Sequence, residues 1–183
     1  MKKNIGKPLV LYPTPVTLVG AFVEKKPNWM IVAHVGIIGH DRIMISAVKA
    51  HYTNKGIREN KILSVSLIDE KFLKSADRAG CSSGNKIDKS AMFDFEIGEK
   101  GSPIPKDSPL TMECSVDEIF ETKGFENFIL KIENVYADEK ILDEKGKVSL
   151  HNFKPALFSM PTYEYFSTGE FLGKCMHMND EKN

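Results

Sequence analysis

The sequence predicts a mainly β protein, an antiparallel barrel that carries a few short helices. Three observations lead to this fold class: short β-branched runs are many, helical segments are few and short, and strands and helices do not alternate in the βαβ order of a parallel sheet. The 183 residues are enough for one well-packed domain and too few for two of typical size. We therefore expect one domain over 1–183, with a core over about 9–170 and a flexible end at 174–183.

The first two strands are expected at 16–23 and 30–35, where β-branched residues predominate. The stretch EKKPNW separates them, and its Pro27 and Asn28 are typical of a turn. Together the two runs predict a hairpin-like pair.

Two more strands follow, RIMISAV at 42–48 and ILSVSLI at 62–68. Between them lie a polar junction and a helix of one or two turns over 54–60. Asp69 is a suitable N-cap for a further helix over 70–79, which Gly80 can end. A loop and a second short helix are expected over 81–95.

Strands resume after the proline-rich stretch 101–109. In MECSVDE, at 112–118, apolar and polar residues alternate, and in FILKIENV, at 128–135, Phe128, Leu130 and Ile132 share one face. A turn is expected near Lys123 and Gly124. These patterns predict half-buried antiparallel strands, followed by a turn at 143–147 and an aromatic, proline-containing tail.

Charge and cysteine content exclude several classes of function. Basic and acidic residues number 25 each, so no overall field would attract nucleic acid or an anionic membrane. The three cysteines are far apart and form no C-x-x-C pair, which favours reduced thiols over a disulfide framework or a zinc site. No apolar run reaches the length of a membrane span, so we expect a cytoplasmic protein that binds neither nucleic acid nor membrane.

The polar junction SAVKAHYTNKGIREN, at 46–60, is rich in donors and poor in acidic groups. If a helix starts after it, Thr53 or Asn54 is the N-cap, and the free N–H groups there favour an anion such as a phosphate. Ser46 and Lys49 would add donors at the same point. The alternative is that Thr53 merely caps its own helix and Lys49 is solvated.

The segment GCSSGNKIDK, at 80–89, superficially resembles a phosphate loop. Only three residues separate Gly80 from Gly84, and Ile87 follows Lys86, so the spacing of a nucleotide triphosphatase loop is absent. It is either a flexible loop that brings backbone close to a flat ligand or a simple connector.

A third cluster, PNWMIVAHVG at 27–36, holds the single tryptophan, Trp29, beside the expected turn, and His34 inside an apolar strand. A lone histidine in such a strand is more often structural than catalytic. The sequence shows no triad spacing around it and no metal-ligand spacing among the other histidines.

Taken in order, the motifs YPTPVTLVGA, NWMIVAHVG, ISAVKAHYTNKGIREN, SVSL, GCSSGNKIDK and KPALF resemble the flavin reductase-like family, and more closely its flavoredoxin-like branch. The resemblance covers about 9–170. It implies an FMN-binding split barrel, a six-stranded antiparallel Greek-key barrel that forms a homodimer with FMN at the subunit interface.

The resemblance also implies which residues hold FMN. The segment that would bind the ribityl chain and phosphate comprises Ser46, Ala47, Val48, Lys49, Tyr52 and Thr53. The strand that would lie along the isoalloxazine ring carries Asn28, Trp29, Met30 and His34, where relatives often have tryptophan in place of His34. The loop that would close over the other side carries Cys81, Ser82, Ser83, Gly84 and Lys89.

Three functions follow as alternatives. The first is an oxidoreductase that passes electrons from NADH or NADPH to the flavin, with the redox chemistry on the flavin and no catalytic side chain required. The second is a flavoredoxin-type electron carrier served by a redox protein partner. The third is a barrel that binds a non-flavin ligand such as haem.

Overall fold

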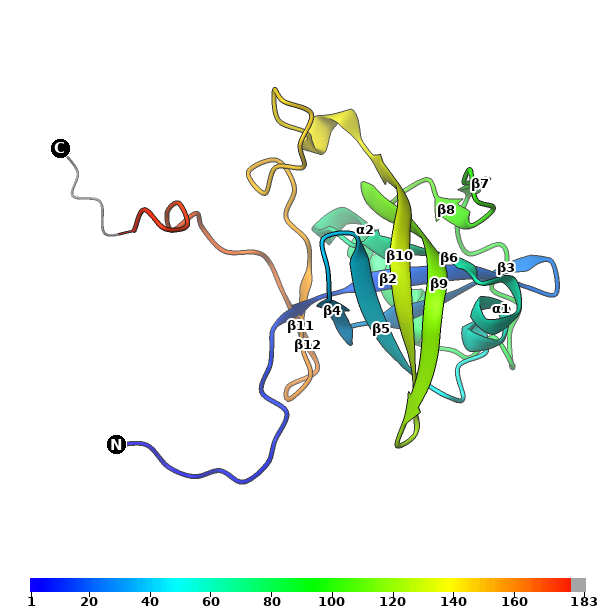
Figure 1. Ribbon diagram of the computed structural model, residues 1–183, viewed down its shortest axis with the longest axis horizontal. Coiled ribbons are helices and arrows are strands. Elements are labelled where there is room, and N and C mark those ends of the chain that lie inside the picture. Colours follow the sequence, from blue (N-terminus) through cyan, green and yellow to red (C-terminus); the bar gives the residue numbers. More distant parts are fainter. Residues whose placement is uncertain (179–183) are drawn as a thin grey trace.

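The structure, a computed structural model, describes residues 1–178 and is built around a seven-stranded antiparallel sheet (Figure 1). In spatial order its strands are β3 (Lys26–Val32), β2 (Thr17–Val23), β6 (Ile62–Leu67), β9 (Leu110–Thr122), β10 (Phe125–Ala137), β5 (Arg42–Val48) and β4 (Val35–Ile37). Two small sheets flank it, one of β1 (Thr14–Pro15), β11 (Leu157–Ser159) and β12 (Glu164–Phe166), the other of β7 (Phe95–Ile97) and β8 (Pro103–Pro105).

The sheet closes on itself because β3 and β4 are two halves of one bent strand. β3 pairs with β2 at one edge, and β4, two residues later, pairs with β5 at the other. Between the halves, His34 O accepts a 2.9 Å hydrogen bond from Ser46 N of β5. With β3 and β4 counted together the barrel has six strands, which confirms the predicted fold class.

The turn between β2 and β3 is tighter than the sequence indicated. Glu24 and Lys25 form it, both with positive φ (51° and 66°), as a two-residue hairpin loop requires. The expected turn at Pro27 and Asn28 is wrong, because both residues are buried inside β3. β3 is the last strand in the sheet order, where the missing proline N–H costs no ladder bond.

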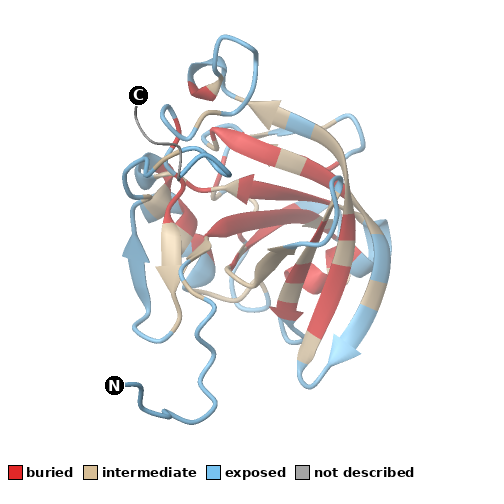
Figure 2. Cartoon of the chain, turned by 60° about the vertical axis from the view of Figure 1, so that its left-hand side comes forward, coloured by how far each residue is buried: buried red, intermediate tan, exposed pale blue. Residues whose placement is uncertain are grey.

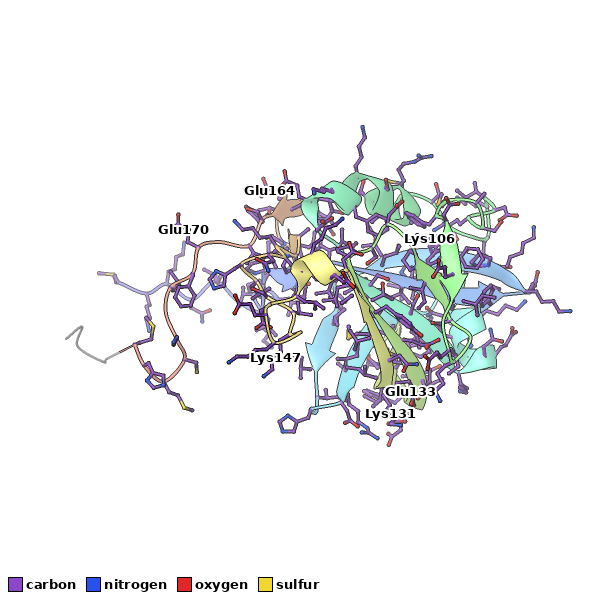
Figure 3. All side chains as sticks on the ribbon, turned by 90° about the horizontal axis from the view of Figure 1, so that it is seen from above. Lys106, Lys131, Glu133, Lys147, Glu164 and Glu170 are labelled. Atoms are coloured by element: carbon purple, nitrogen blue, oxygen red, sulfur yellow. The ribbon has the colours of Figure 1, made fainter. Side chains whose placement is uncertain are left out.

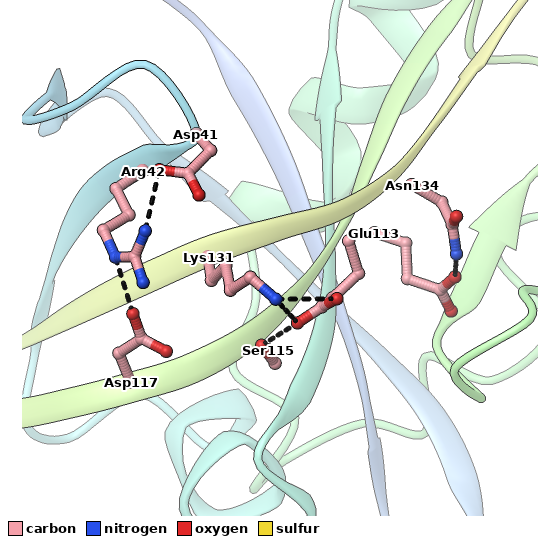
Figure 4. Close-up of polar contacts among 8 residues, drawn as sticks. Asp41, Arg42, Glu113, Ser115, Asp117, Lys131 and Asn134 are labelled. Carbon is pink, nitrogen blue, oxygen red and sulfur yellow. Dashed lines mark hydrogen bonds and ion pairs between the residues drawn. The ribbon is translucent and has the colours of Figure 1, made fainter.

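β9 and β10 are 13 residues each, longer than the sequence patterns predicted, and they turn at Lys123 and Gly124 as expected. Polar side chains pair along these strands (Figure 4): Arg42 of β5 donates a hydrogen bond to Asp117, and Ser115 donates one to Glu133. The Glu113 side chain is fully buried beside Asn134, which donates a 2.9 Å hydrogen bond to Glu113 Oε2.

Helix α1 (Thr53–Asn60) lies against β2. A Cβ on Gly56 would stand 2.1 Å from Phe22 O, so only glycine permits this approach. The predicted capping by Thr53 or Asn54 is wrong: Tyr52 is the N-cap residue and makes no capping side-chain bond. The Thr53 side chain instead accepts a bond from Asn28 of β3, because tertiary packing brings that amide within 2.7 Å.

Helix α2 (Glu70–Gly80) begins as predicted, with Asp69 accepting a 2.9 Å bond from Phe72 N. The second short helix expected over 81–95 is wrong, since residues 81–94 form turns and bends. Side chains compete with helical bonding there: Ser83 Oγ accepts from Asn85 N, and Asp88 Oδ1 accepts from Ser90 N.

Two apolar clusters make up most of the core (Figure 2). The barrel interior holds Val19, Met30, Ile45, Leu63, Val65, Phe128 and Leu130. The second cluster lies between α2 and the outer face of β2 and β3, where the Trp29 ring meets Phe93 edge to face at 5.3 Å. Trp29 is therefore a core residue within a strand and does not lie at a turn.

Both ends of the described chain extend away from the barrel (Figure 1). The C-terminal segment passes the hairpin β11–β12, where Glu164 lies, and then Glu170 farther out (Figure 3). The predicted flexible end at 174–183 falls partly outside the described residues, which stop at 178. Within residues 1–178, no helix is both long and apolar enough to cross a membrane.

Candidate functional site

Three adjoining cavities follow the ends of β3 and β5, the junction before α1, and the loop after α2. The apolar cavity, about 280 Å³, adjoins the polar cavity, about 240 Å³, through the shared wall residues Ile31 and His51. The polar cavity in turn adjoins an outer cavity of about 300 Å³ through Asn28, Tyr52, Gly84 and Lys89. We refer to these three neighbouring cavities together as the recess.

The apolar cavity lies where β5 passes the bend between β3 and β4. Its inner wall is His34, Ser46, Ala47 and Val48, and Phe125 packs on His34 at 5.7 Å between ring centroids. His34 Nε2 lies 3.0 Å from the Tyr12 hydroxyl. Burial, followed by nearby Tyr163, raises the pKa of Tyr12, so its hydroxyl stays protonated near neutral pH.

The C-terminal hairpin supplies the outer wall of the apolar cavity. Phe158, Met160, Tyr163 and Tyr165 all line it. The Phe158 ring lies 5.7 Å from that of Tyr165 and 6.1 Å from that of Tyr163. An aromatic wall opposite strand backbone suits a flat, largely apolar ligand.

The polar cavity gathers hydroxyl and amide groups. Buried Asn28 donates a 2.7 Å hydrogen bond to Thr53 Oγ1, which joins β3 to the first turn of α1. The loop residues Cys81, Ser82, Ser83 and Gly84 line the opposite side. A Cβ on Gly84 would lie 2.5 Å from Asn28 Oδ1 and 2.6 Å from Tyr52 Cδ1, so glycine allows the loop to close this tightly.

Lys89 places a positive charge in the wall between the polar and outer cavities. Its side chain is buried, and Nζ donates to Trp29 O at 3.0 Å and to Ala79 O, a carbonyl in the last turn of α2, at 2.5 Å. Burial lowers the pKa of Lys89, and nearby Cys81 opposes this shift. The lysine thus fastens the end of α2 to β3 and adds to the electrostatics of the recess.

His51 is exposed in the open recess where the apolar and polar cavities meet. Loss of hydration lowers its pKa first, and the positive charge of Lys89 lowers it further. His51 is therefore neutral at pH 7 and can donate or accept a hydrogen bond.

The structure brings most of the predicted site residues together. Lining the apolar or polar cavity are Asn28, Met30, His34, Ser46, Ala47, Val48, Tyr52, Thr53, Cys81, Ser82, Ser83, Gly84 and Lys89. Trp29 lies in the core instead, and Lys49 pairs with Glu121 on the β9–β10 hairpin. For all of these residues, contact with FMN stays a prediction.

Sequence reasoning missed several lining residues. His51 lies inside the junction already singled out, so its place between Lys49 and Tyr52 was a usable signal. Phe125 and the hairpin residues Met160, Tyr163 and Tyr165 gave no such signal. They reach the cavity only through strand pairing and chain folding.

Comparison with known proteins decides the family. Residues 9–165 match the family described as "Flavin reductase like domain". The chain belongs to the flavin reductase-like family. Membership covers most of its length and makes it a flavin-related oxidoreductase or electron carrier, as the motif order predicted.

Solved structures of this family include close relatives of the chain. Flavoredoxin from Methanosarcina acetivorans is 33% identical, with a TM-score of 0.92 and 98% of each chain covered. Flavoredoxin of Desulfovibrio vulgaris (Miyazaki F) is 32% identical, with a TM-score of 0.88, covering 96% of this chain and 98% of that one.

A more distant likeness shows the fold alone. The FMN-binding protein from Thermus thermophilus with bound 1-cyclohex-2-enone is 19% identical, with a TM-score of 0.82, covering 96% of this chain and all of that one. Among curated proteins, none matches the chain.

Proposed function

We propose that this flavin reductase-like chain binds FMN and acts as an oxidoreductase that takes electrons from NADH or NADPH. The observation that carries the proposal is the order of the three cavities: apolar and aromatic, then lined by hydroxyl and amide groups, then lined by three lysines together with Glu24 and Asp88. FMN has the same order of parts, a tricyclic ring, a polyhydroxy chain and a phosphate. The residues present therefore fit the cofactor.

The ring would lie between His34 and the aromatic hairpin wall, and the ribityl chain beside Asn28 and Thr53. The phosphate would then point toward Lys89 and the N-terminus of α1, since the helix dipole and the ammonium group both favour an anion. Lys49 pairs with Glu121 and lines none of these three cavities, whereas Lys89 lines two of them, so we assign the phosphate to Lys89.

Bound flavin would supply the redox chemistry, accepting a hydride or single electrons. The chain's own residues would position it and limit water around it. The aromatic hairpin covers one side of the apolar cavity, and neutral His51 adds a hydrogen-bonding group without a charge.

A flavoredoxin-type electron carrier is the second candidate. It is favoured by the 33% and 32% identity to two proteins named flavoredoxin over nearly the whole chain. In that case a redox protein partner would replace the nicotinamide as electron donor.

We also propose a homodimer in the cytoplasm. The extended N-terminal segment exposes Ile5, Leu9 and Leu11, and the C-terminal one exposes Phe171 and Leu172. A second copy of the chain would cover these side chains. Cys81, Cys114 and Cys175 are unpaired, which fits a reducing compartment.

The test is a titration of flavin-free protein with FMN and with riboflavin, followed by anaerobic addition of NADH or NADPH. FMN should bind at least tenfold more tightly than riboflavin because only FMN carries the phosphate. In Lys89→Met this advantage should fall to a few-fold or less, while the matched variant Lys49→Met should retain it.

Bleaching of the bound flavin by a nicotinamide would support the reductase. Reduction by dithionite or by a small redox protein alone would support the carrier. Failure to bind any flavin would overturn both, and haem would then be the ligand to try.

A further inference from the structure

The hairpin β11–β12 stands apart from the barrel sheet, although it forms the outer wall of the apolar cavity (Figure 1). Among the described residues, the only strand that pairs with the hairpin is β1, with two residues in register. Two backbone hydrogen bonds hold Ala156, just before the hairpin. Val16 N donates to Ala156 O at 3.0 Å, and Ala156 N donates to Ile68 O at 2.7 Å. The second strand, β12, is exposed and, in the part of the chain that the structure describes, pairs with β11 alone.

Within residues 1–178, one side-chain hydrogen bond ties β12 to the chain outside the hairpin. The Tyr165 hydroxyl donates a 2.7 Å hydrogen bond to Asp77 Oδ1 in α2, across 88 residues of sequence. Burial, and then this bond, raise the pKa of Tyr165, so the phenol remains a donor at neutral pH. A hydroxyl donating to a carboxylate is among the stronger hydrogen bonds in proteins.

Asp77 also lies next to the polar cavity. Its backbone oxygen accepts bonds from Cys81 N at 3.2 Å and from Cys81 Sγ at 3.4 Å. Tyr165 lines the apolar cavity and Cys81 lines the polar one, so Asp77 connects the outer walls of both.

We propose that Asp77 is a positioning residue that holds Tyr165, and with it the hairpin β11–β12, closed over the flavin, and so sets how long the flavin stays bound. The proposal rests on the proposed function. Phe158 of β11 packs on the core, whereas β12 has few backbone bonds, so loss of the Tyr165–Asp77 contact should raise the fraction of time that the β12 side of the wall is open. The same contact would decide whether FMN behaves as a resident cofactor or as a substrate that exchanges.

Three variants test the contact. Tyr165→Phe removes the hydroxyl and keeps the ring, Asp77→Ala removes the acceptor at a helical position that alanine favours, and the third variant combines them. Each single change should speed flavin dissociation by about five- to tenfold, the value of one ordinary, solvent-exposed hydrogen bond. The double variant should be no faster than the faster single variant, because both changes break the same bond. Exposed Asp107→Ala removes the same charge at a site away from the recess and should keep the wild-type rate.

The readouts are flavin release, followed by the return of flavin fluorescence on dilution, and hydrogen exchange of residues 157–166 in flavin-free protein. Both single variants should exchange faster in 157–166 while β9 and β10 remain protected. If the wild type binds FMN but the variants release it at the wild-type rate, or if their effects add, the positioning role is overturned and the proposed function stands. If the wild type binds no flavin, the proposed function fails, and unchanged exchange in 157–166 would overturn the contact independently.

Discussion

At the scale of single residues, Lys89 and His51 show how burial shapes the charge of the recess. The Lys89 ammonium is held by the carbonyls of Trp29 and Ala79, which keep it inside the wall. Its charge and the loss of hydration both disfavour a proton on His51. Loss of hydration and the charge of Lys89 therefore strengthen the preference of His51 for its neutral form at pH 7.

We expect His51 to titrate below pH 6.5, the ordinary value for histidine, in an NMR titration of its ring protons. Because the pKa of His51 is lower in the folded protein than in the unfolded chain, the contribution of neutral His51 to the free energy of unfolding is fully present above about pH 6.5. That contribution is lost as the pH falls through the pKa of the folded protein. Lys89→Met should move the His51 pKa upward. Lys106→Met, directly after β8 and outside the recess, should not. A wild-type pKa at or above 6.5 would contradict the proposed environment.

At the scale of elements, helix α1 is placed by contact with β2 more than by its own sequence. Gly56 lies against Phe22 O, and Asn54 Nδ2 donates to Val48 O and to buried Glu126 at 3.1 and 2.7 Å. Arg58 pairs with the same Glu126 carboxylate at 2.6 Å. These contacts fix the junction that carries His51, Tyr52 and Thr53 into the recess.

Gly56→Ala should therefore lower the free energy of unfolding by about 1–3 kcal/mol, the usual cost of overpacking, although alanine is the better helix former. A Cβ at Gly36 meets nothing within 4 Å, so Gly36→Ala in β4 is the matched control and should change stability little. Urea denaturation followed by circular dichroism gives both values. Equal stability of the two variants would show that α1 is not seated on β2 in this way.

At the scale of the whole molecule, apolar side chains are exposed where the two termini leave the barrel. Phe171 and Leu172 are 65% and 87% exposed, and Ile37 at the end of β4 is 86% exposed. Side chains of this size are seldom left in water on an isolated subunit when they gather on extended segments. They are the basis for proposing a second copy of the chain as partner.

Sedimentation equilibrium should therefore give twice the chain mass of 20.6 kDa. Replacing both Phe171 and Leu172 by aspartate should weaken self-association at least tenfold, because burial of two charges would oppose it. Ile97→Asp, on β7 across the molecule from both termini in Figure 1, should leave the mass unchanged. A monomeric wild type at micromolar concentration would refute the dimer.

Much of the fold was predictable because its signals are local. Alternation along 112–118 and 128–135, the turn at Gly124 and the Asp69 cap depend on neighbours in sequence. The structure confirms the two strands, the turn and the cap, whereas Glu113, expected on the polar face, is buried. Pro27 misled the sequence reasoning because a proline tolerated in a strand at the end of the sheet looks the same as one in a turn.

The sequence by itself determined the strand pattern, the order of motifs that places the chain in its family, and a set of candidate residues most of which line the recess. Only the tertiary structure decided that Trp29 is a core residue, that Thr53 bonds Asn28 without capping α1, and that the hairpin β11–β12 closes the apolar cavity. The reason is physical: caps and alternation act over a few residues, whereas the bond from Tyr165 to Asp77 depends on how segments 88 residues apart pack together.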